Sequence, residues 1–147
     1  MESKILEAIK SAWGWIGIRP QKLYWLNKFG NIIVKDEGGC YWLIRPEELS
    51  CEIIAWTEDE MTKLWKDEDF VLDWEMTVLV DLAEEKFGKN INDRCFYFVI
   101  SPVLGGKYEL QNIQTVPILD LVSFSGDIAE QIKDLPEGAQ VKIVVTD

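Results

Sequence analysis

Three β-rich runs follow one another closely, and this spacing is the strongest constraint on the fold. They occupy residues 31–34, 40–44 and 52–56. The sequence Asp-Glu-Gly-Gly at residues 36–39 separates the first two runs and has the composition of a hairpin turn. Connections this short join antiparallel neighbours, so the runs predict an antiparallel meander. Between the second and third runs, Pro-Glu-Glu at residues 46–48 predicts a single helical turn, because proline and acids fit a first turn.

A helical pattern precedes the meander. Apolar residues repeat there at helical spacing: Ile5, Leu6, Ile9 and Trp13. Gly14 and Gly17 then break the helix. Pro20 begins a second short helix, predicted over residues 20–26. We therefore expect residues 1–28 to form an N-terminal helical segment.

Two helices are predicted after the meander. Thr57 and Glu60 form a capping box that marks the start of the first. The second covers residues 68–87 and is closed by Gly88 at the position after the last turn. Its expected buried stripe is apolar: Val71, Trp74, Val78 and Leu82. Its other face is acidic, with residues four apart on one ridge: Asp69, Asp73, Thr77 and Asp81.

The remaining pattern completes an α+β fold. Residues 95–100 and 113–116 predict strands, residues 118–135 predict a helix that Gly126 can break, and residues 141–145 predict a closing strand. We expect a mostly antiparallel β-sheet of about five to six strands packed with several helices. A length of 147 residues fits a single domain.

Charge and composition exclude several functions. The net charge of -11 should repel a phosphate backbone, so we expect no direct nucleic-acid partner. The absence of histidine excludes Ser-His-Asp and Cys-His nucleophiles and histidine-bound zinc. A two-carboxylate glycosidase or a Mg²⁺ site needs no histidine, but no spacing singles one out. We therefore expect no catalytic, cofactor-binding or metal-binding residue and no enzyme activity.

The cysteines and the chain start favour a cytoplasmic protein. Cys40, Cys51 and Cys95 are odd in number, lack CxxC spacing and lie among apolar residues, as buried thiols do. The first residues show no signal-peptide pattern, and no apolar run approaches the ~18 residues of a membrane span. We expect a reducing compartment and no membrane partner.

The charge is concentrated in residues 58–86, which we call the acidic segment. It holds 11 acidic residues against 3 lysines, a net charge of -8. Such a segment is either a solvated face or a docking face for a strongly basic partner. Because no catalytic motif is present, we expect the chain to act by binding, through Asp67, Glu68, Asp69, Asp73 and Asp81.

The seven tryptophans offer one further candidate contact. Most lie at apolar positions of their predicted elements, where burial in the core is usual. Trp15 lies between Gly14 and Gly17 in a broken segment and is the best candidate among them for an exposed anchor that contacts a partner. Packing in the core is nevertheless the favoured interpretation for Trp15.

Several segments resemble recurrent segments of one bacterial family. They are Phe-Gly-Asn-Ile-Ile-Val at residues 29–34, Tyr-Trp-Leu-Ile-Arg-Pro-Glu-Glu-Leu-Ser-Cys-Glu at 41–52, Asp-Trp-Glu-Met-Thr at 73–77, Pro-Val-Leu-Gly-Gly-Lys-Tyr at 102–108 and Phe-Ser-Gly-Asp-Ile-Ala at 124–129. The family includes the C-terminal domain of Tdi-type immunity proteins. The resemblance runs from about residue 25 to the end, so residues 29–147 are expected to form one immunity-protein-like α+β unit.

The resemblance implies a function in type VI secretion. In such systems the immunity protein binds and neutralises a DNase toxin, and so protects the producing cell and its kin. This implies a non-enzymatic, stoichiometric inhibitor whose partner is a cognate secreted toxin, a basic nuclease. The alternatives are a small-molecule or peptide-binding regulatory domain and, third, an enzyme with carboxylate chemistry. A pocket lined by tryptophan and Arg45 would favour ligand binding.

Overall fold

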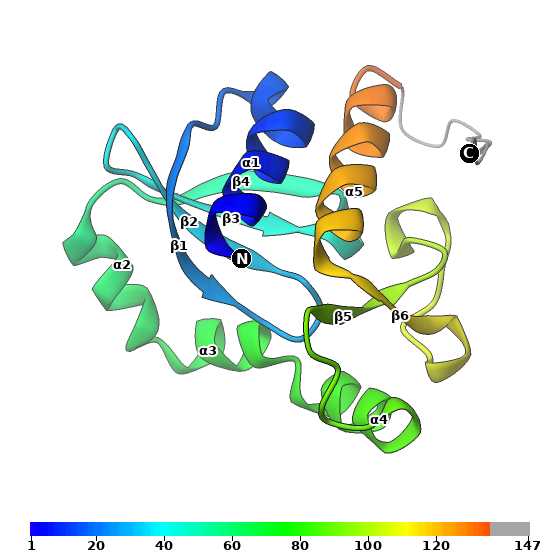
Figure 1. Cartoon of the computed structure of the whole chain (residues 1–147). Coiled ribbons are helices and arrows are strands. Elements are labelled where there is room, and N and C mark those ends of the chain that lie inside the picture. The colour runs from blue at the N-terminus through cyan, green and yellow to red at the C-terminus, as the bar shows by residue number, and fades with distance from the viewer. Residues whose placement is uncertain (136–147) are drawn as a thin grey trace.

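The computed structural model describes residues 1–135, with a four-stranded antiparallel sheet at their centre (Figure 1). The strands lie side by side in chain order: β1 Pro20–Leu26, β2 Ile32–Asp36, β3 Tyr41–Arg45 and β4 Ser50–Ala55. Each pairs antiparallel with the next. The predicted meander is confirmed, and one more strand is added before it.

The turn between β2 and β3 is held by a buried aspartate, Asp36. Its carboxylate accepts hydrogen bonds from the N–H groups of Arg19 at 2.7 Å and Gly38 at 2.8 Å, and from the Trp42 indole at 3.1 Å. The N–H of Gly39 donates to the Asp36 carbonyl at 2.9 Å, closing the predicted hairpin turn. These bonds satisfy a carboxylate that would otherwise be costly to bury.

Residues 20–26 form a strand, so the predicted second short helix is wrong. Residues 1–28 are therefore not helical throughout. Leu23 pairs with Val34 and Trp25 with Ile33. Pairing with β2 outweighs the local helical tendency, and Pro20 is tolerated because it begins an edge strand.

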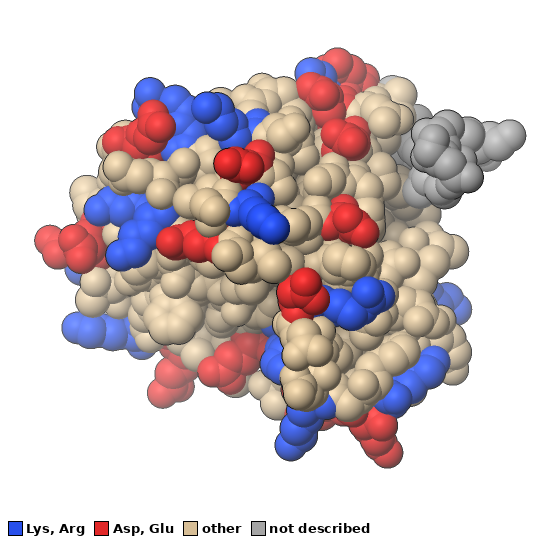
Figure 2. Space-filling view, in the orientation of Figure 1, with Lys and Arg blue, Asp and Glu red and all other residues tan. Residues whose placement is uncertain are grey.

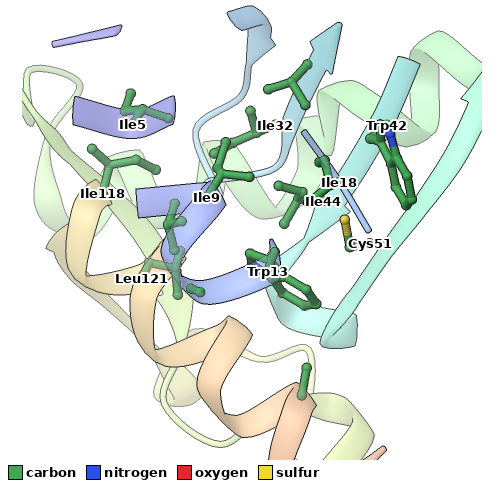
Figure 3. Packing of buried hydrophobic residues seen from close by; sticks show 14 of the residues in the cluster. Ile5, Ile9, Trp13, Ile18, Ile32, Trp42, Ile44, Cys51, Ile118 and Leu121 are labelled. Carbon is green, nitrogen blue, oxygen red and sulfur yellow. The ribbon is translucent and has the colours of Figure 1, made fainter. Parts of the chain in front are cut away.

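One face of the sheet is covered by α1, Glu2–Trp13, and α5, Ile118–Ile132. Figure 3 shows their apolar side chains pointing toward one another and toward the strands. The two helices approach so closely that a Cβ on Gly126 would lie 2.7 Å from the Ala12 Cβ. Gly126 therefore packs against α1 instead of breaking α5, which runs through it without interruption.

The opposite face is covered by two short helices of the acidic segment, α2 Glu58–Trp65 and α3 Glu68–Glu75. The third helix of this segment, α4 Thr77–Phe87, continues along the lower edge of the view in Figure 1 and packs through Ala83 on a separate group of buried residues. The packing beneath α2 and α3 includes Met61 and Trp74. Each of the three helices has one buried residue, whereas α5 has six.

The start of α2 confirms the predicted cap. The Thr57 side chain accepts a hydrogen bond from the N–H of Glu60 at 3.2 Å. The Glu60 carboxylate accepts from the N–H of Trp56, one residue before the cap, at 2.7 Å. Two N–H groups at the start of the helix are thereby satisfied.

A second sheet extends the molecule beside α4 and α5. It pairs β5, Arg94–Phe98, with β6, Ile113–Pro117, so the predicted strands form two sheets instead of one. Two single-turn 3-10 helices, Pro102–Leu104 and Leu110–Asn112, lie in the connection. Its buried residues pack against α4 around Ala83.

The α+β fold class is confirmed. The described residues contain six strands, in sheets of four and two. Short 3-10 turns, Gly14–Ile16 and Pro46–Glu48, follow α1 and β3, and the second confirms the predicted helical turn. The predicted closing strand at residues 141–145 lies outside the described residues. Within residues 1–135, no helix has the length and apolar character needed to span a bilayer.

Candidate functional site

Residues 68–87 form two helices, so the predicted single helix is wrong. Met76 lies between α3 and α4 with φ +50° and ψ +40°, the left-handed region. This conformation ends the regular hydrogen-bond ladder of α3 and starts α4 in a new direction. Asp69 and Asp73 lie on α3 whereas Asp81 lies on α4, so the predicted continuous acidic ridge is not formed.

The break is explained by a distant side chain, Asn27. Its amide N–H donates to the Trp74 carbonyl at 2.8 Å. In a continuous helix that carbonyl would accept from the N–H of Val78. The Asn27 side-chain carbonyl also accepts from the N–H groups of Phe29 and Asn31, so the β1–β2 turn fixes the end of α3.

The acidic residues predicted to bind a partner have different environments. Asp67 is the N-cap of α3 and accepts from the N–H groups of Asp69 at 2.9 Å and Phe70 at 3.3 Å. Asp73 accepts a hydrogen bond of 2.5 Å from Arg45 at the end of β3. The others, Glu68, Asp69 and Asp81, are exposed and form no ion pair within residues 1–135.

Trp15 lies on the other side of the sheet. It is partly buried against the cluster beneath α1 and α5, and its ring stacks on Trp13 with a centroid distance of 6.0 Å. The ammonium of Lys133 lies 5.1 Å from the Trp15 ring centroid. The structure therefore does not bring Trp15 together with the predicted acidic residues.

The break at Met76 leaves apolar side chains exposed. Val78 is 75% exposed, Leu72 is 65% exposed and Leu82 is 39% exposed. The sequence pattern had placed Val78 and Leu82 in one buried stripe with Trp74. Because α4 starts in a new direction, Ala83 faces the core in their place. No local signal revealed this, because the pattern assumes one continuous helix.

A hollow of about 380 Å³, which we call the Tyr108 hollow, opens beside these residues. It joins four parts of the chain: the turn after β3, the end of α3, the start of α4 and the loop before β6. Its charged lining consists of Arg45, Glu47, Glu48 and Asp73. Its exposed apolar walls are Leu72, Val78 and Tyr108.

Arg45 holds the charged lining together. Its guanidinium contacts Asp73 and lies 4.0 Å from the Glu48 carboxylate. Burial lowers the pKa of Arg45, but the hydrogen bond and charge of Asp73 outweigh it and hold the pKa above its ordinary value. Arg45 therefore stays charged, and two neighbouring carboxylates compete for one cation.

Glu47 also lines the hollow, but its side chain is buried. Burial raises the pKa of its carboxyl to about 7, although a hydrogen bond of 2.9 Å from the Asn31 amide favours the charged form. The Glu47 carbonyl accepts from the Ser101 hydroxyl at 2.8 Å, which ties this turn to the connection after β5. Burial and the charges of Glu48 and Glu47 also raise the pKa of Tyr108.

A second hollow of about 390 Å³ lies on the other side of Arg45, along β4. Its apolar lining includes Leu43, Ile54 and Phe70, and it shares Arg45 and Glu48 with the Tyr108 hollow. No tryptophan lines either hollow. The tryptophan-and-arginine pocket that would favour a small ligand is therefore not formed around Arg45.

Other candidate sites have weaker chemistry. A hollow of about 580 Å³ near the start of α1 is lined by Lys28 and Arg94. Lys28 donates to the Lys89 carbonyl and Arg94 to Thr115, so both cations are already partnered. No group of metal ligands occurs within residues 1–135.

The cysteines are unpaired thiols within the described residues. Cys51 and Cys95 are buried, and burial raises the pKa of each thiol to about 12. A thiol with such a pKa stays protonated at neutral pH and is a poor nucleophile. Catalysis by these two residues is therefore not supported.

Negative charge is concentrated in the acidic segment. Figure 2 shows Lys and Arg interspersed with Asp and Glu over the side of the molecule in view. The acidic segment has a net charge of -8. A surface with excess charge and exposed apolar residues can recognise a basic protein.

Comparison with known proteins identifies one family. The family model described as T6SS immunity protein Tdi1, C-terminal, matches residues 57–129, about half of the chain. The match includes α2, α3, α4 and the second sheet, and therefore most of the Tyr108 hollow. No curated protein matches the chain.

Proposed function

Since the chain belongs to the family of the T6SS immunity protein Tdi1 C-terminal domain, we propose that it binds a cognate type VI secretion toxin and neutralises it as a stoichiometric inhibitor. The toxin is a DNase with a basic surface for DNA, and the complex forms in the cytoplasm. The chain acts by binding and catalyses no reaction.

The observation that supports the proposal is the concentration of exposed carboxylates on α3 and α4, although they form no continuous ridge. We use the name acidic surface for the predicted residues Asp67, Glu68, Asp69, Asp73 and Asp81. It belongs to a segment with a net charge of -8, next to the exposed side chains of Leu72 and Val78. A DNase surface that holds phosphates presents the opposite charge, so binding here would exclude the DNA.

The residues of the acidic surface have unequal roles in this proposal. Glu68, Asp69 and Asp81 attract the toxin, because no ion pair within residues 1–135 neutralises them. Asp67 also caps α3 and Asp73 also holds Arg45, so replacing either one disturbs the structure as well as the charge. Trp15 is not part of this surface, since it packs on the opposite face.

Attraction between opposite charges accelerates association, whereas buried apolar contacts set the lifetime of the complex. The acidic surface supplies the attraction between charges, and the exposed side chains of Leu72 and Val78 supply the apolar contacts. We therefore expect fast association that slows as salt is added, and dissociation that depends little on salt.

The test is a rescue assay with the candidate toxin encoded beside this chain's gene. The toxin is expressed in a naive host with and without this protein, and the pair is then copurified. Rescue with a stoichiometric complex is expected. Absence of both rescue and complex would overturn the proposal and favour the regulatory domain that binds a small molecule or peptide.

Matched triple variants test the surface. Glu68→Gln, Asp69→Asn and Asp81→Asn together remove three charges from the acidic surface. The control triple is Glu7→Gln, Asp127→Asn and Glu130→Gln, which removes three exposed charges from α1 and α5. Association at low salt should slow about tenfold for the first triple and much less for the control. Equal effects of the two triples would remove the acidic surface from the proposal.

A further inference from the structure

We propose that the Tyr108 hollow receives a basic side chain, arginine or lysine, from the partner protein. This inference rests on the proposed function, because it names the chemistry by which the partner is anchored. It adds a specific contact to the general attraction of the acidic surface. The occupant follows from the charges, the walls and the rigidity of the hollow.

The charges of the hollow leave a surplus carboxylate. Arg45 contributes one positive charge, whereas Asp73 at 2.5 Å and Glu48 at 4.0 Å contribute two negative ones. Asp73 makes the closer contact with Arg45, so the charge of Glu48 is less fully neutralised. The Glu48 side chain is 46% exposed. A second cation entering from the partner would give Glu48 a full counter-charge, whereas an anion would be repelled.

The charges around the Tyr108 hydroxyl also disfavour an anion. Its hydroxyl has a raised pKa because of burial and because Glu48, Glu47 and Asp73 outweigh the opposing charge of Arg45. A phenol with a raised pKa reports an environment that disfavours negative charge. At Tyr108, the charges of the neighbouring carboxylates therefore add to burial in disfavouring an anion.

The walls suit a long cationic side chain. Leu72, Val78 and Tyr108 are more than half exposed and surround the charged lining. Methylene groups of arginine or lysine pack well on such surfaces while the charged end stays near carboxylates. The ring of Tyr108 also offers a face to a cation.

The Tyr108 wall is held in place before a partner arrives. The ring contacts Phe98 edge-on, with centroids 5.1 Å apart. The Asn112 amide donates to the carbonyls of Lys107 at 2.9 Å and Ile100 at 2.8 Å, which closes the loop. At Gly106 a Cβ would lie 1.7 Å from the Ile100 carbonyl oxygen, so the loop closes only with glycine. A prearranged wall needs little ordering on binding.

The experiment measures affinity for a catalytically inactive form of the purified toxin. Tyr108→Ala should weaken binding at least tenfold, because it removes both the wall and the ring face. Tyr108→Phe keeps the ring and should stay within about twofold of wild type. Glu48→Gln should weaken binding about fivefold and reduce its salt dependence, whereas the matched Glu85→Gln on α4 should stay within about twofold.

Two double-mutant cycles identify the occupant. Each exposed arginine and lysine of the toxin is replaced by alanine and measured against wild type, Tyr108→Ala and Glu48→Gln. One basic residue should show a coupling of at least fivefold with Tyr108 and with Glu48. Wild-type binding without any such coupling would overturn this inference and leave the proposed function intact. Failure of the wild-type protein to bind would overturn the proposed function itself.

Discussion

On one face of the four-stranded sheet, α1 and α5 pack so closely that only glycine fits at position 126, whereas on the other face Leu72 and Val78 remain mostly exposed. The difference follows from helix length and contact. α5 has 15 residues, of which six are buried, whereas α3 has 8 residues and buries Trp74 alone. A short helix with one anchor leaves apolar groups available for another protein.

The two faces contribute differently to stability and to recognition. The face under α1 and α5 contains the largest cluster of buried apolar residues, in which Ile5, Ile9 and Trp13 are at most 1% exposed and stabilise the fold through burial. The face with α3 and α4 combines exposed apolar side chains with excess negative charge. Stability and recognition should therefore respond to different substitutions.

The largest expected effect is on stability, and it should distinguish a substitution under α1 and α5 from one on α3. Ile9→Ala removes a fully buried side chain and should lower the free energy of unfolding by about 2–5 kcal/mol. Leu72→Ala, at a position 65% exposed, should change it by less than about 0.5 kcal/mol. Urea unfolding followed by tryptophan fluorescence measures both.

Toxin affinity should show the reverse order. Leu72→Ala should weaken binding about tenfold, the loss expected for an apolar contact at the edge of a binding site. Ile9→Ala should leave the affinity of the folded protein unchanged. If Leu72→Ala destabilised the fold as much as Ile9→Ala does, the proposed division between the two faces would be wrong.

Local patterns predicted those elements whose cause is local. The turn at residues 36–39 and the cap formed by Thr57 need only neighbouring residues, and both are present. The α1 pattern succeeded for the same reason, because Ile5, Ile9 and Trp13 already define one helical face. The α+β fold class follows from such local elements taken together.

Elements with a distant cause were predicted wrongly. Residues 20–26 are a strand because β2 lies beside them. The helix over residues 68–87 is broken because Asn27, 47 positions before Trp74, binds the Trp74 carbonyl. The apolar pattern of neither segment reveals the interaction, because the partner residue lies elsewhere in the chain.

In the candidate site, too, the sequence indicated some residues, whereas others are brought together only by the fold. A count of charges was enough to select Glu68, Asp69 and Asp81, because exposed carboxylates follow from composition. The Tyr108 hollow was not predicted, since Arg45 and Tyr108 come from distant parts of the chain and meet only in the fold. Asp73 was predicted as a free contact, and its ion pair with Arg45 depends on the same folding.

Glu47 gives a pH-dependent contribution to stability at a turn that packs against α5 and also lines the Tyr108 hollow. Burial raises its carboxyl pKa from 4.5 to about 7. The folded chain therefore keeps a proton that the unfolded chain loses between these values. The resulting stabilisation is fully present below pH 4.5 and is lost as the pH rises through about 7.

Glu47→Gln should remove this pH dependence, since glutamine is neutral and still accepts a hydrogen bond from Asn31. The free energy of unfolding of the variant, minus that of wild type, should rise from pH 5 to pH 8 with a slope of at most about 1.4 kcal/mol per pH unit. Urea unfolding at four pH values gives this difference. Glu85→Gln is the control, and a flat difference for Glu47→Gln would contradict the prediction.

The smallest effect separates the two roles of Asp67, the N-cap of α3. Asp67→Ala removes the acceptor for the N–H groups of Asp69 and Phe70 and should cost about 1 kcal/mol of unfolding free energy. Asp67→Asn keeps an oxygen acceptor and should cost a few tenths of that. Both variants remove the same charge, so both should slow toxin association about twofold at low salt. Equal loss of stability in the two variants would show that the charge of Asp67, and not its capping oxygen, stabilises α3. An unchanged association rate in both would instead limit Asp67 to its structural role, and the acidic surface would then begin at Glu68.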